Sequence, residues 1–431
     1  MKQKLGIWMV FSLCLIPIVL WIMMVQLNIR FANLNAATRS LGQLMGLMGI
    51  TLFSINIILS SRWKFLEDLF NGQNQVYKYH HLIGGITLIL LLSHPLLLSI
   101  TYLNISADLT LKFLLGQTQN GVFWGDYALG LLILLLILTF FLRPVYHLWK
   151  TTHQFLTLAF FLAFLHIINI SSDISQNTIL RFYILLLISC AFLSSIYRTF
   201  FPNLLVKHYK YVLDKIKKLT PDIIELTLSP LQQNMKYLPG QFVFISIDDK
   251  TFSHEEHPFS ITSHPQSTEL KLVIKDLGDY TQKLFSIKSG SKVNIEGSFG
   301  KFTYYLYPNK NQIWIAGGIG ITPFVSMLKD LNNYPEYKIK LYYSIRNKDD
   351  VIYGEFLNQF AKNLPNFKFI PHISSDQGRL NIQVLKNDLH SLDNYDYFIC
   401  GPKKMMDDLR SQLISEKIKS QNIHMEDFEL S

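Results

Sequence analysis

Six apolar runs constrain this chain more than any other feature of its sequence. A helix that crosses a bilayer needs about 20 predominantly apolar residues, and each run is roughly that long. The first run follows Lys2 and Lys4, but its length exceeds that of a signal-peptide core, so we expect it to be retained. The sequence predicts a bundle of six transmembrane helices near residues 7–27, 41–60, 80–101, 122–142, 154–172 and 179–197.

Basic residues between these runs predict the orientation of the bundle, because cytoplasmic loops carry an excess of Lys and Arg. One face has Lys2, Lys4, Arg62, Lys64, Lys78, Arg143, Lys150, Arg198, Lys207 and Lys210. The other face has Arg30, Arg39, Lys112 and Arg181. We expect the first face to be cytoplasmic. The net charge of +9 then mostly reflects topology, and without a basic patch interleaved with aromatics we expect no nucleic-acid partner.

Two histidines lie inside the third apolar run. His80 and His94 are fourteen residues apart, which on an ideal helix separates them by ~40° around the axis and ~21 Å along it. Imidazoles are costly in hydrocarbon unless they serve a function. Two at this separation indicate ligands for two stacked metal centres, for which haem is the obvious candidate. His81 is rotated by ~100° from His80, so we expect it at headgroup level.

The fifth run carries a second pair, His153 and His166, thirteen residues apart. This spacing leaves the rings ~140° apart on an ideal helix, so we expect a bulge, supercoiling or differently rotated haems to absorb the mismatch. Any one of these histidines alone could merely cap or snorkel at a helix end. Together the four predict two haem b groups, the inner held by His80 and His153, the outer by His94 and His166.

Beyond Phe200 short alternating runs and frequent charges indicate a water-soluble part. PGQFVFI (239–245) and HPFSITS (257–263) read as strand, turn and strand of a small antiparallel barrel. His257 could face a phosphate, and Ser260 could hydrogen-bond a flavin ring. In KDLGDYTQKL (275–284), Gly278 allows close backbone approach to a phosphate beside the amide and hydroxyl of Thr281. A turn capped by Ser is the alternative for HPFS.

A glycine-rich loop follows an apolar strand in IWIAGGIGITPFVSML (313–328). Gly317, Gly318 and Gly320 would let backbone N–H groups approach a dinucleotide pyrophosphate at the start of a helix. Thr322 and Pro323 then begin that helix. The alternative is a plain structural turn, since the loop lacks the GxGxxG form. LYYSIRN (341–347) and YFICGPKKMM (397–406) supply two further strand ends for a ligand crevice.

The motifs HPFSITS, GGIGITP and CGP, in this order, resemble those of the ferredoxin–NADP reductase family. With the histidine pairs, nearly the full chain resembles the NADPH oxidase/ferric reductase superfamily. The resemblance implies a multi-domain membrane protein in three parts. These are a six-helix transmembrane haem domain (1–200), an antiparallel β-barrel FAD domain (201–308) and an α/β parallel-sheet NADPH-binding domain (309–431).

The resemblance also implies roles for individual residues. FAD would be held by His257, Pro258, Phe259, Ser260, Thr262, Lys275, Gly278 and Thr281. NADPH would be held by Gly317, Gly318, Gly320, Thr322, Cys400, Gly401 and Pro402, with Ser344 and Arg346 at its 2′-phosphate. Phe428 would cover the flavin ring as a catalytic residue, although three residues follow it. Many flavin reductases have Arg-x-Tyr-Ser where this chain has His-Pro-Phe-Ser.

The activity implied is electron transfer from cytoplasmic NADPH through FAD and two b-type haems to an acceptor across the membrane. Oxygen giving superoxide is the leading acceptor. The alternatives are a ferric-chelate reductase of the same architecture and a quinone-linked b-type cytochrome. We expect membrane lipid and a small acceptor as partners, no obligate protein partner, and location in a bacterial inner membrane with the dehydrogenase part in the cytoplasm. No EF-hand loop is present, so calcium control is not expected.

Overall fold

The computed structural model describes residues 5–115, 117, 121–140, 146–201, 207–249, 252, 256–389 and 391–426. The chain divides into two compact units, Met1–Leu205 and Val206–Ser431. Phe428 lies outside the described residues.

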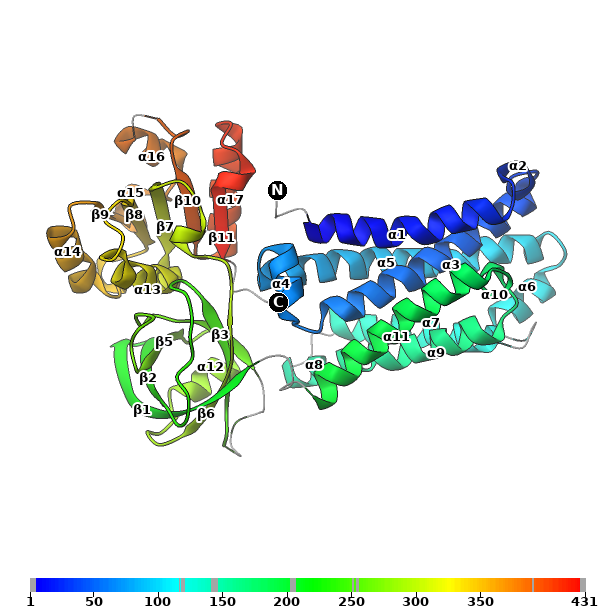
Figure 1. The fold of residues 1–431 in the computed structure, drawn as a ribbon, viewed down its shortest axis with the longest axis horizontal. Helices are drawn as coiled ribbons and strands as arrows, with labels where there is room; N and C mark the ends of the chain where they lie inside the picture. The colour runs from blue at the N-terminus through cyan, green and yellow to red at the C-terminus, as the bar shows by residue number, and fades with distance from the viewer. Residues whose placement is uncertain are drawn as a thin grey trace. The chain divides into compact units, whose positions relative to one another are not determined.

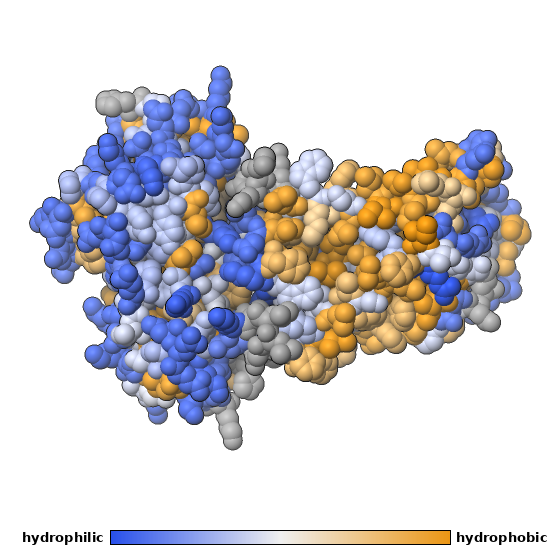
Figure 2. All heavy atoms as spheres, in the orientation of Figure 1, coloured by the Kyte–Doolittle hydropathy of each residue, from blue (hydrophilic) through white to orange (hydrophobic). Residues whose placement is uncertain are grey.

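Six helices of the first unit are long and apolar enough to cross a membrane within the described ranges. Figure 1 shows them as a bundle and Figure 2 shows their apolar surface. The predicted multi-pass membrane bundle is confirmed. The spans are α1 (Leu5–Met24), α3 (Leu34–Leu59), α5 (Gln73–Leu103), α7 (Val122–Phe140), α8 (Tyr146–Gln154) with α9 (Leu156–Asn169), and α11 (Thr178–Phe200). Short helices join them: α2 (Leu27–Arg30), α4 (Lys64–Phe70), α6 (Ala107–Leu114) and α10 (Asp173–Gln176).

Helices α3 and α5 begin about seven residues before the predicted apolar runs, because polar residues can continue a helix outside hydrocarbon. The start of α3 is fixed by Asn33, whose side chain accepts a hydrogen bond from the amide of Ala36 at 2.9 Å. Helix α5 begins at Gln73, so His80 lies about two turns inside the helix and not at its beginning.

The fifth span is interrupted at Phe155, between α8 and α9. The amide of Phe155 approaches the carbonyls of Thr151 and Thr152 at 3.4 and 3.2 Å, and Leu158 donates to the Phe155 carbonyl at 2.9 Å. Such three-residue hydrogen bonds overwind a helix. The irregularity lies between His153 and His166, and a local irregularity was one of the three alternatives expected from their spacing. Overwinding at this place would reduce the angular mismatch between the two rings.

The second unit begins with a six-stranded antiparallel sheet in the order β4-β3-β6-β1-β2-β5. A bridge between Ile261 and Leu272 joins the end of β4 to β5, so the sheet curls into a barrel around an apolar core. The predicted antiparallel barrel is confirmed. Its elements are β1 (His208–Thr220), β2 (Ile223–Pro230), β3 (Phe242–Ile247), β4 (His257–Ser260), β5 (Leu270–Lys275), α12 (Asp279–Leu284) and β6 (Lys292–Phe299).

A five-stranded parallel sheet follows in the order β11-β10-β7-β8-β9, which confirms the predicted α/β part. Its strands are β7 (Asn311–Gly317), β8 (Lys338–Ile345), β9 (Phe367–Ile373), β10 (Asp396–Cys400) and β11 (Ile423–Glu426). Its main helices are α13 (Thr322–Leu331), α14 (Gly354–Asn363), α16 (Ile382–Asp388) and α17 (Lys403–Ser415). Shorter helical segments are η3 (Tyr304–Leu306), η4 (Gly318–Ile321), η5 (Lys348–Asp350), α15 (Ser374–Gln377) and η6 (Ser420–Asn422).

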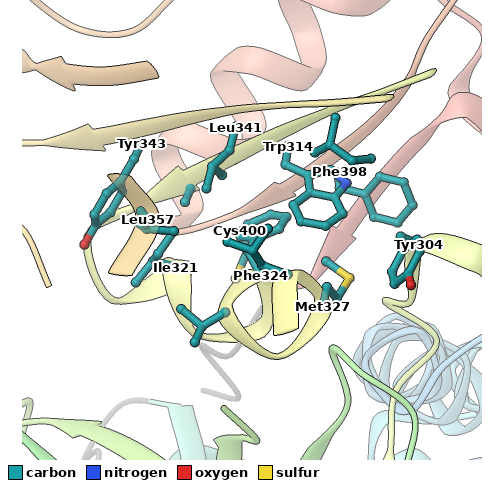
Figure 3. Close-up of a cluster of buried hydrophobic side chains, with 14 of the residues drawn as sticks. Tyr304, Trp314, Ile321, Phe324, Met327, Leu341, Tyr343, Leu357, Phe398 and Cys400 are labelled. Carbon is teal, nitrogen blue, oxygen red and sulfur yellow. The ribbon is translucent and has the colours of Figure 1, made fainter. Parts of the chain in front are cut away.

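Side chains of β7 alternate between two cores, as the two-residue period of a strand requires. Trp314 faces the core built with α13, where Phe324 packs on it with ring centroids 5.5 Å apart (Figure 3). Ile313 and Ile315 face the opposite core with residues of α16 and α17. Both faces of the sheet are therefore covered, and its carboxyl edge remains the place for a ligand.

Candidate functional site

The four histidines of the membrane unit meet as two pairs. The ring centroids of His80 and His153 are 6.1 Å apart, and those of His94 and His166 are 6.4 Å apart. The pairs are those that depth along the helices predicted. His81 is exposed, and its ring lies 6.0 Å from that of His80.

This separation suits two imidazoles that bind one metal ion from opposite sides. A nitrogen bound at about 2 Å puts each ring centre roughly 3 Å from the metal, so the two centres lie about 6 Å apart. Each histidine pair would hold a haem through its two imidazoles, and the haem would bring the other ligands of its iron with it. Within the described residues no group of three or more His, Cys, Asp or Glu side chains could hold a bare metal ion.

Backbone carbonyls fix three of the four rings. The Nδ1 atoms of His80, His94 and His166 lie 3.1, 2.7 and 3.0 Å from the carbonyl oxygens of Asn56, Gly42 and Gly121. Because a carbonyl only accepts, each Nδ1 carries the proton. The Nε2 atom of each ring is then unprotonated and can bind a metal.

Glycines on neighbouring helices make room for the outer pair. A Cβ added at Gly46 would lie 2.6 Å from Nδ1 of His94, and one added at Gly125 would lie 2.9 Å from Nδ1 of His166. In both cases the glycine four residues earlier, Gly42 or Gly121, supplies the carbonyl that the ring bonds. Each outer histidine is therefore held by a pair of glycines spaced by four.

Sequence reasoning missed these glycines, although their spacing was visible. Gly42, Gly46 and Gly49 form a stripe on α3 that lets α5 approach closely. Added Cβ atoms there would meet Leu98, His94 and Leu91 of α5. Small residues at helical spacing opposite a histidine-bearing span were the available signal.

A cavity of about 540 Å³ has His94, His166 and Arg39 in its lining. Among the other lining residues, Trp21, Thr101 and Asp126 each have a buried polar atom without a hydrogen-bond partner in the described structure. These atoms are Nε1 of Trp21, Oγ1 of Thr101 and Oδ2 of Asp126. Buried polar atoms without partners cost free energy, so this cavity suits a ligand that is largely apolar but has polar groups, as haem is.

In the barrel, the segment expected to hold flavin is partly available and partly engaged. The ring of His257 stacks on that of Tyr280, with centroids 3.8 Å apart. Pro258 and Phe259 are partly buried, and Ser260 is buried. The fully buried Thr262 donates from Oγ1 to the Lys271 carbonyl at 3.1 Å. Its hydroxyl therefore serves the closure of the barrel.

The expected phosphate segment is organised by Thr281. Its Oγ1 accepts from the amides of Leu277 and Gly278 at 2.9 Å each and donates to the Gly278 carbonyl at 2.9 Å. A Cβ added at Gly278 would meet nothing within 4 Å. Lys275 faces Asp222 at 3.5 Å. The loop is open on its outer side, and its two amides are directed at Thr281.

The glycine loop and the CGP segment meet at the carboxyl edge of the parallel sheet. Strands β10 and β7 pair with Cys400 opposite Ala316. A Cβ added at Gly320 would lie 2.3 Å from the Cys400 carbonyl oxygen, and one added at Gly401 would lie 2.9 Å from the Gly317 backbone. The two segments pack backbone against backbone, which requires glycine on both sides.

The other predicted residues of this edge lie around the same loop. Gly318 has φ +51 and faces open space. Thr322 is buried and donates to the Ile319 carbonyl at 3.0 Å, and Pro402 lies beside Gly317.

Strand β8 brings its two predicted residues to the same edge. Ser344 pairs with Gly317, and Arg346 is exposed just beyond the strand. Together with Gly317, Gly318, Gly320, Cys400 and Gly401, these residues form one continuous edge. Their ligand roles stay predictions.

Three protein families match consecutive parts of the chain. Residues 45–164 match the ferric reductase like transmembrane component, residues 208–316 an FAD-binding domain, and residues 314–411 an oxidoreductase NAD-binding domain.

Curated relatives match parts of the chain. The 2-halobenzoate 1,2-dioxygenase electron transfer component of Burkholderia cepacia is 26% identical over 47% of this chain and 62% of its own length. A superoxide-generating NADPH oxidase heavy chain of Dictyostelium discoideum is 27% identical over 29% of this chain and 20% of its own. The dual oxidase of Drosophila melanogaster is 34% identical over 28% of this chain and 9% of its own length. The chain spans less than two thirds of the length of each of these three relatives.

Among solved structures, a ferredoxin NADP⁺ reductase from Neisseria gonorrhoeae with bound FAD and NADP is similar to the second unit. The two are 20% identical with a TM-score of 0.45, and the match covers 51% of this chain and 98% of the reductase chain.

The matches and the fold define a class, a membrane-embedded protein with the domain set of an NAD(P)H oxidoreductase. More particularly, the chain joins a ferric reductase-like transmembrane domain to FAD-binding and NAD-binding domains, and its relatives include an NADPH oxidase and a dual oxidase. The resemblance found in the sequence is confirmed at this level.

Proposed function

We propose that this protein carries electrons across a membrane, from NADPH through FAD and two b-type haems to an acceptor on the other side. The leading acceptor is oxygen, which would give superoxide. We further propose a bacterial inner membrane location with the dehydrogenase part in the cytoplasm, and domains over residues 1–200, 201–308 and 309–431.

The observation that carries this proposal is the meeting of four histidines as two pairs, with ring centroids 6.1 and 6.4 Å apart. A single pair would serve one redox centre at one depth. Two pairs on the same two spans, with ligands ~21 Å apart along α5, provide centres near both surfaces. That arrangement is what electron transfer through hydrocarbon requires.

The residues of the chain bind and orient the groups. Carbonyls of Asn56, Gly42 and Gly121 fix three imidazole tautomers, and the cavity beside His94 and His166 would take the outer haem. Bound FAD would supply the chemistry that links a two-electron donor to one-electron acceptors.

In the soluble unit the backbone forms the proposed nucleotide site. The glycine loop leads into α13, whose first amides favour an anion. Arg346, exposed past the end of β8, can supply the positive charge for a 2′-phosphate.

Purified full-length protein with NADPH tests the proposal and its acceptor. Flavin and haem bands that bleach on anaerobic NADPH addition support the electron path. Cytochrome c reduction in air that superoxide dismutase inhibits supports oxygen as acceptor. Ferric-chelate reduction that is insensitive to superoxide dismutase would identify ferric iron as the acceptor. Activity that appears only with added quinone would contradict both oxygen and iron as acceptors.

A further inference from the structure

Two side chains of the NAD-binding segment reach across to the FAD-binding segment within the second unit. The Nζ of Lys329 donates to the carbonyl oxygen of Thr262 at 2.7 Å. The Oγ of Ser326 donates to the carbonyl oxygen of Ser263 at 2.8 Å. Both donors lie on α13, and both acceptors follow β4.

The two bonds connect the places where the two cofactors are expected. Helix α13 begins directly after the glycine loop, and β4 is the strand HPFS. Residues 326 and 329 lie on one helix face, and their acceptors are consecutive carbonyls. Two bonds at this spacing fix both the distance and the rotation of α13 relative to β4.

Charged and aromatic groups from β2, β5 and α14 lie around the Lys329 ammonium. Glu225 of β2 accepts a hydrogen bond from the hydroxyl of Tyr353 and lies 3.9 Å from Nζ of Lys271 on β5. The Phe356 ring of α14 lies 5.6 Å from Lys329 Nζ. Burial and the charge of Lys271 lower the pKa of Lys329 to about 8, and Glu225 opposes this shift.

Holding an ammonium here costs desolvation that an apolar side chain of similar length would avoid. Its hydrogen bond to Thr262 is what an apolar side chain could not replace. The desolvation cost of Lys329 is therefore explained by the position that its hydrogen bond fixes, and not by the space that its side chain fills.

We propose that Lys329, together with Ser326, is a clamp that positions the nicotinamide of NADPH against the flavin. The inference rests on the proposed transfer of hydride from NADPH to FAD, in which NADPH is oxidised and FAD is reduced. A misplacement of about 1 Å between reacting groups can slow a reaction roughly a hundredfold. Lys329 is thus a positioning residue, since it acts through α13 and β4.

The test is Lys329→Met in the full chain, compared with Lys362→Met, which removes an exposed lysine of α14. Flavin reduction at saturating NADPH is followed anaerobically by stopped flow, together with the nicotinamide–flavin charge-transfer band and the FAD content. Lys329→Met should reduce its flavin roughly ten- to a hundredfold more slowly, with a weakened band, full FAD and a nearly unchanged KM. Lys362→Met should behave as wild type.

A wild-type rate and band in FAD-loaded Lys329→Met overturn the clamp, even if its Tm falls. Wild-type protein that binds FAD but does not reduce it with NADPH overturns the proposed function itself, so the two failures are distinguishable.

Lys329→Arg and Ser326→Ala provide the test if Lys329→Met does not fold. The wild-type rate should fall above pH about 8, because a neutral amine donates a weaker hydrogen bond to the Thr262 carbonyl than an ammonium does and also loses its attraction to Glu225. Arginine stays charged, so the Lys329→Arg profile should lack that fall, and Ser326→Ala should slow reduction less than Lys329→Met. The same alkaline fall in wild type and Lys329→Arg overturns the proposal.

Discussion

The membrane unit (Met1–Leu205) and the second unit (Val206–Ser431) build their sites in different ways. In the membrane unit two imidazoles converge from different helices on each proposed haem, so side chains define the site. At the carboxyl edge of the parallel sheet, Gly320 and Gly401 bring backbone against backbone, so the absence of side chains defines it. The difference teaches that deletion of a side chain should be most damaging in the first unit and addition of a methyl group in the second.

Removal of one imidazole should have the largest effect. His94→Ala should lower the haem content from about two to about one per chain, because a bis-histidine haem loses an axial ligand. Pyridine haemochrome quantification with redox titration measures this, and the low-spin signal of the inner haem should remain. A His94→Ala protein with two haems and unchanged spectra would contradict the ligand assignment.

A methyl group at Gly320 should be nearly as damaging to the second unit. Its Cβ would lie 2.3 Å from the Cys400 carbonyl oxygen, and backbone cannot move aside cheaply. Gly320→Ala should abolish flavin reduction by NADPH. It should also lower the free energy of unfolding by about 1–3 kcal/mol, which corresponds to a fall in Tm of several degrees. Haem content and reduction of the haems by dithionite are the internal controls. Normal NADPH binding in this variant would show that the edge tolerates side chains.

Gly46→Ala tests whether the rule for the membrane unit is too simple, since glycine also matters there. The added Cβ would lie 2.6 Å from Nδ1 of His94 and should displace the ring, which lowers occupancy of the outer haem. Gly85→Ala is the matched control on α5, where a Cβ meets nothing within 4 Å. Equal haem content in both variants would mean that the ring moves freely.

Arg346 is the exception in the second unit, because it is a side chain at an edge otherwise built from backbone. A guanidinium pairs with a 2′-phosphate that NADH lacks, for roughly 1.5–3 kcal/mol, or about ten- to a hundredfold. Arg346→Ala should raise the KM for NADPH by that factor and leave the KM for NADH nearly unchanged. Steady-state kinetics with both nucleotides measures this, and equal losses for NADPH and NADH would contradict a role at the 2′-phosphate.

Phe428 should give the smallest effect. It lies outside the described residues, but β11 ends at Glu426 beside β10, with the Glu426 carboxylate near Gly300 of the barrel. An aromatic ring over the flavin would contribute about 0.5–1.5 kcal/mol beyond burial. Phe428→Ala should keep both haems, tighten NADP⁺ binding and change the stopped-flow rate of flavin reduction. A lower Tm with unchanged flavin kinetics and NADP⁺ affinity would make Phe428 an anchor.

Local patterns in the sequence determined which elements form. Hydropathy over about 20 residues sets the spans, and the rise per residue sets the relative depths of His80 and His94. The motifs around Gly317 and Cys400 predicted strand ends, because a buried strand followed by glycine has few other structures. These features depend on neighbours along the chain, so one sequence suffices to find them.

Tertiary structure alone decided which distant groups meet. Periodicity does not say that the Gly42 carbonyl faces His94, that Thr262 closes the barrel, or that Lys329 of one domain meets the Thr262 carbonyl of another. Each contact follows from how helices and strands pack in three dimensions, and a shift of one residue in register would replace it with another. The sequence by itself therefore determined the elements and their candidate ligands, while the packing decided the partners that hold those ligands in place.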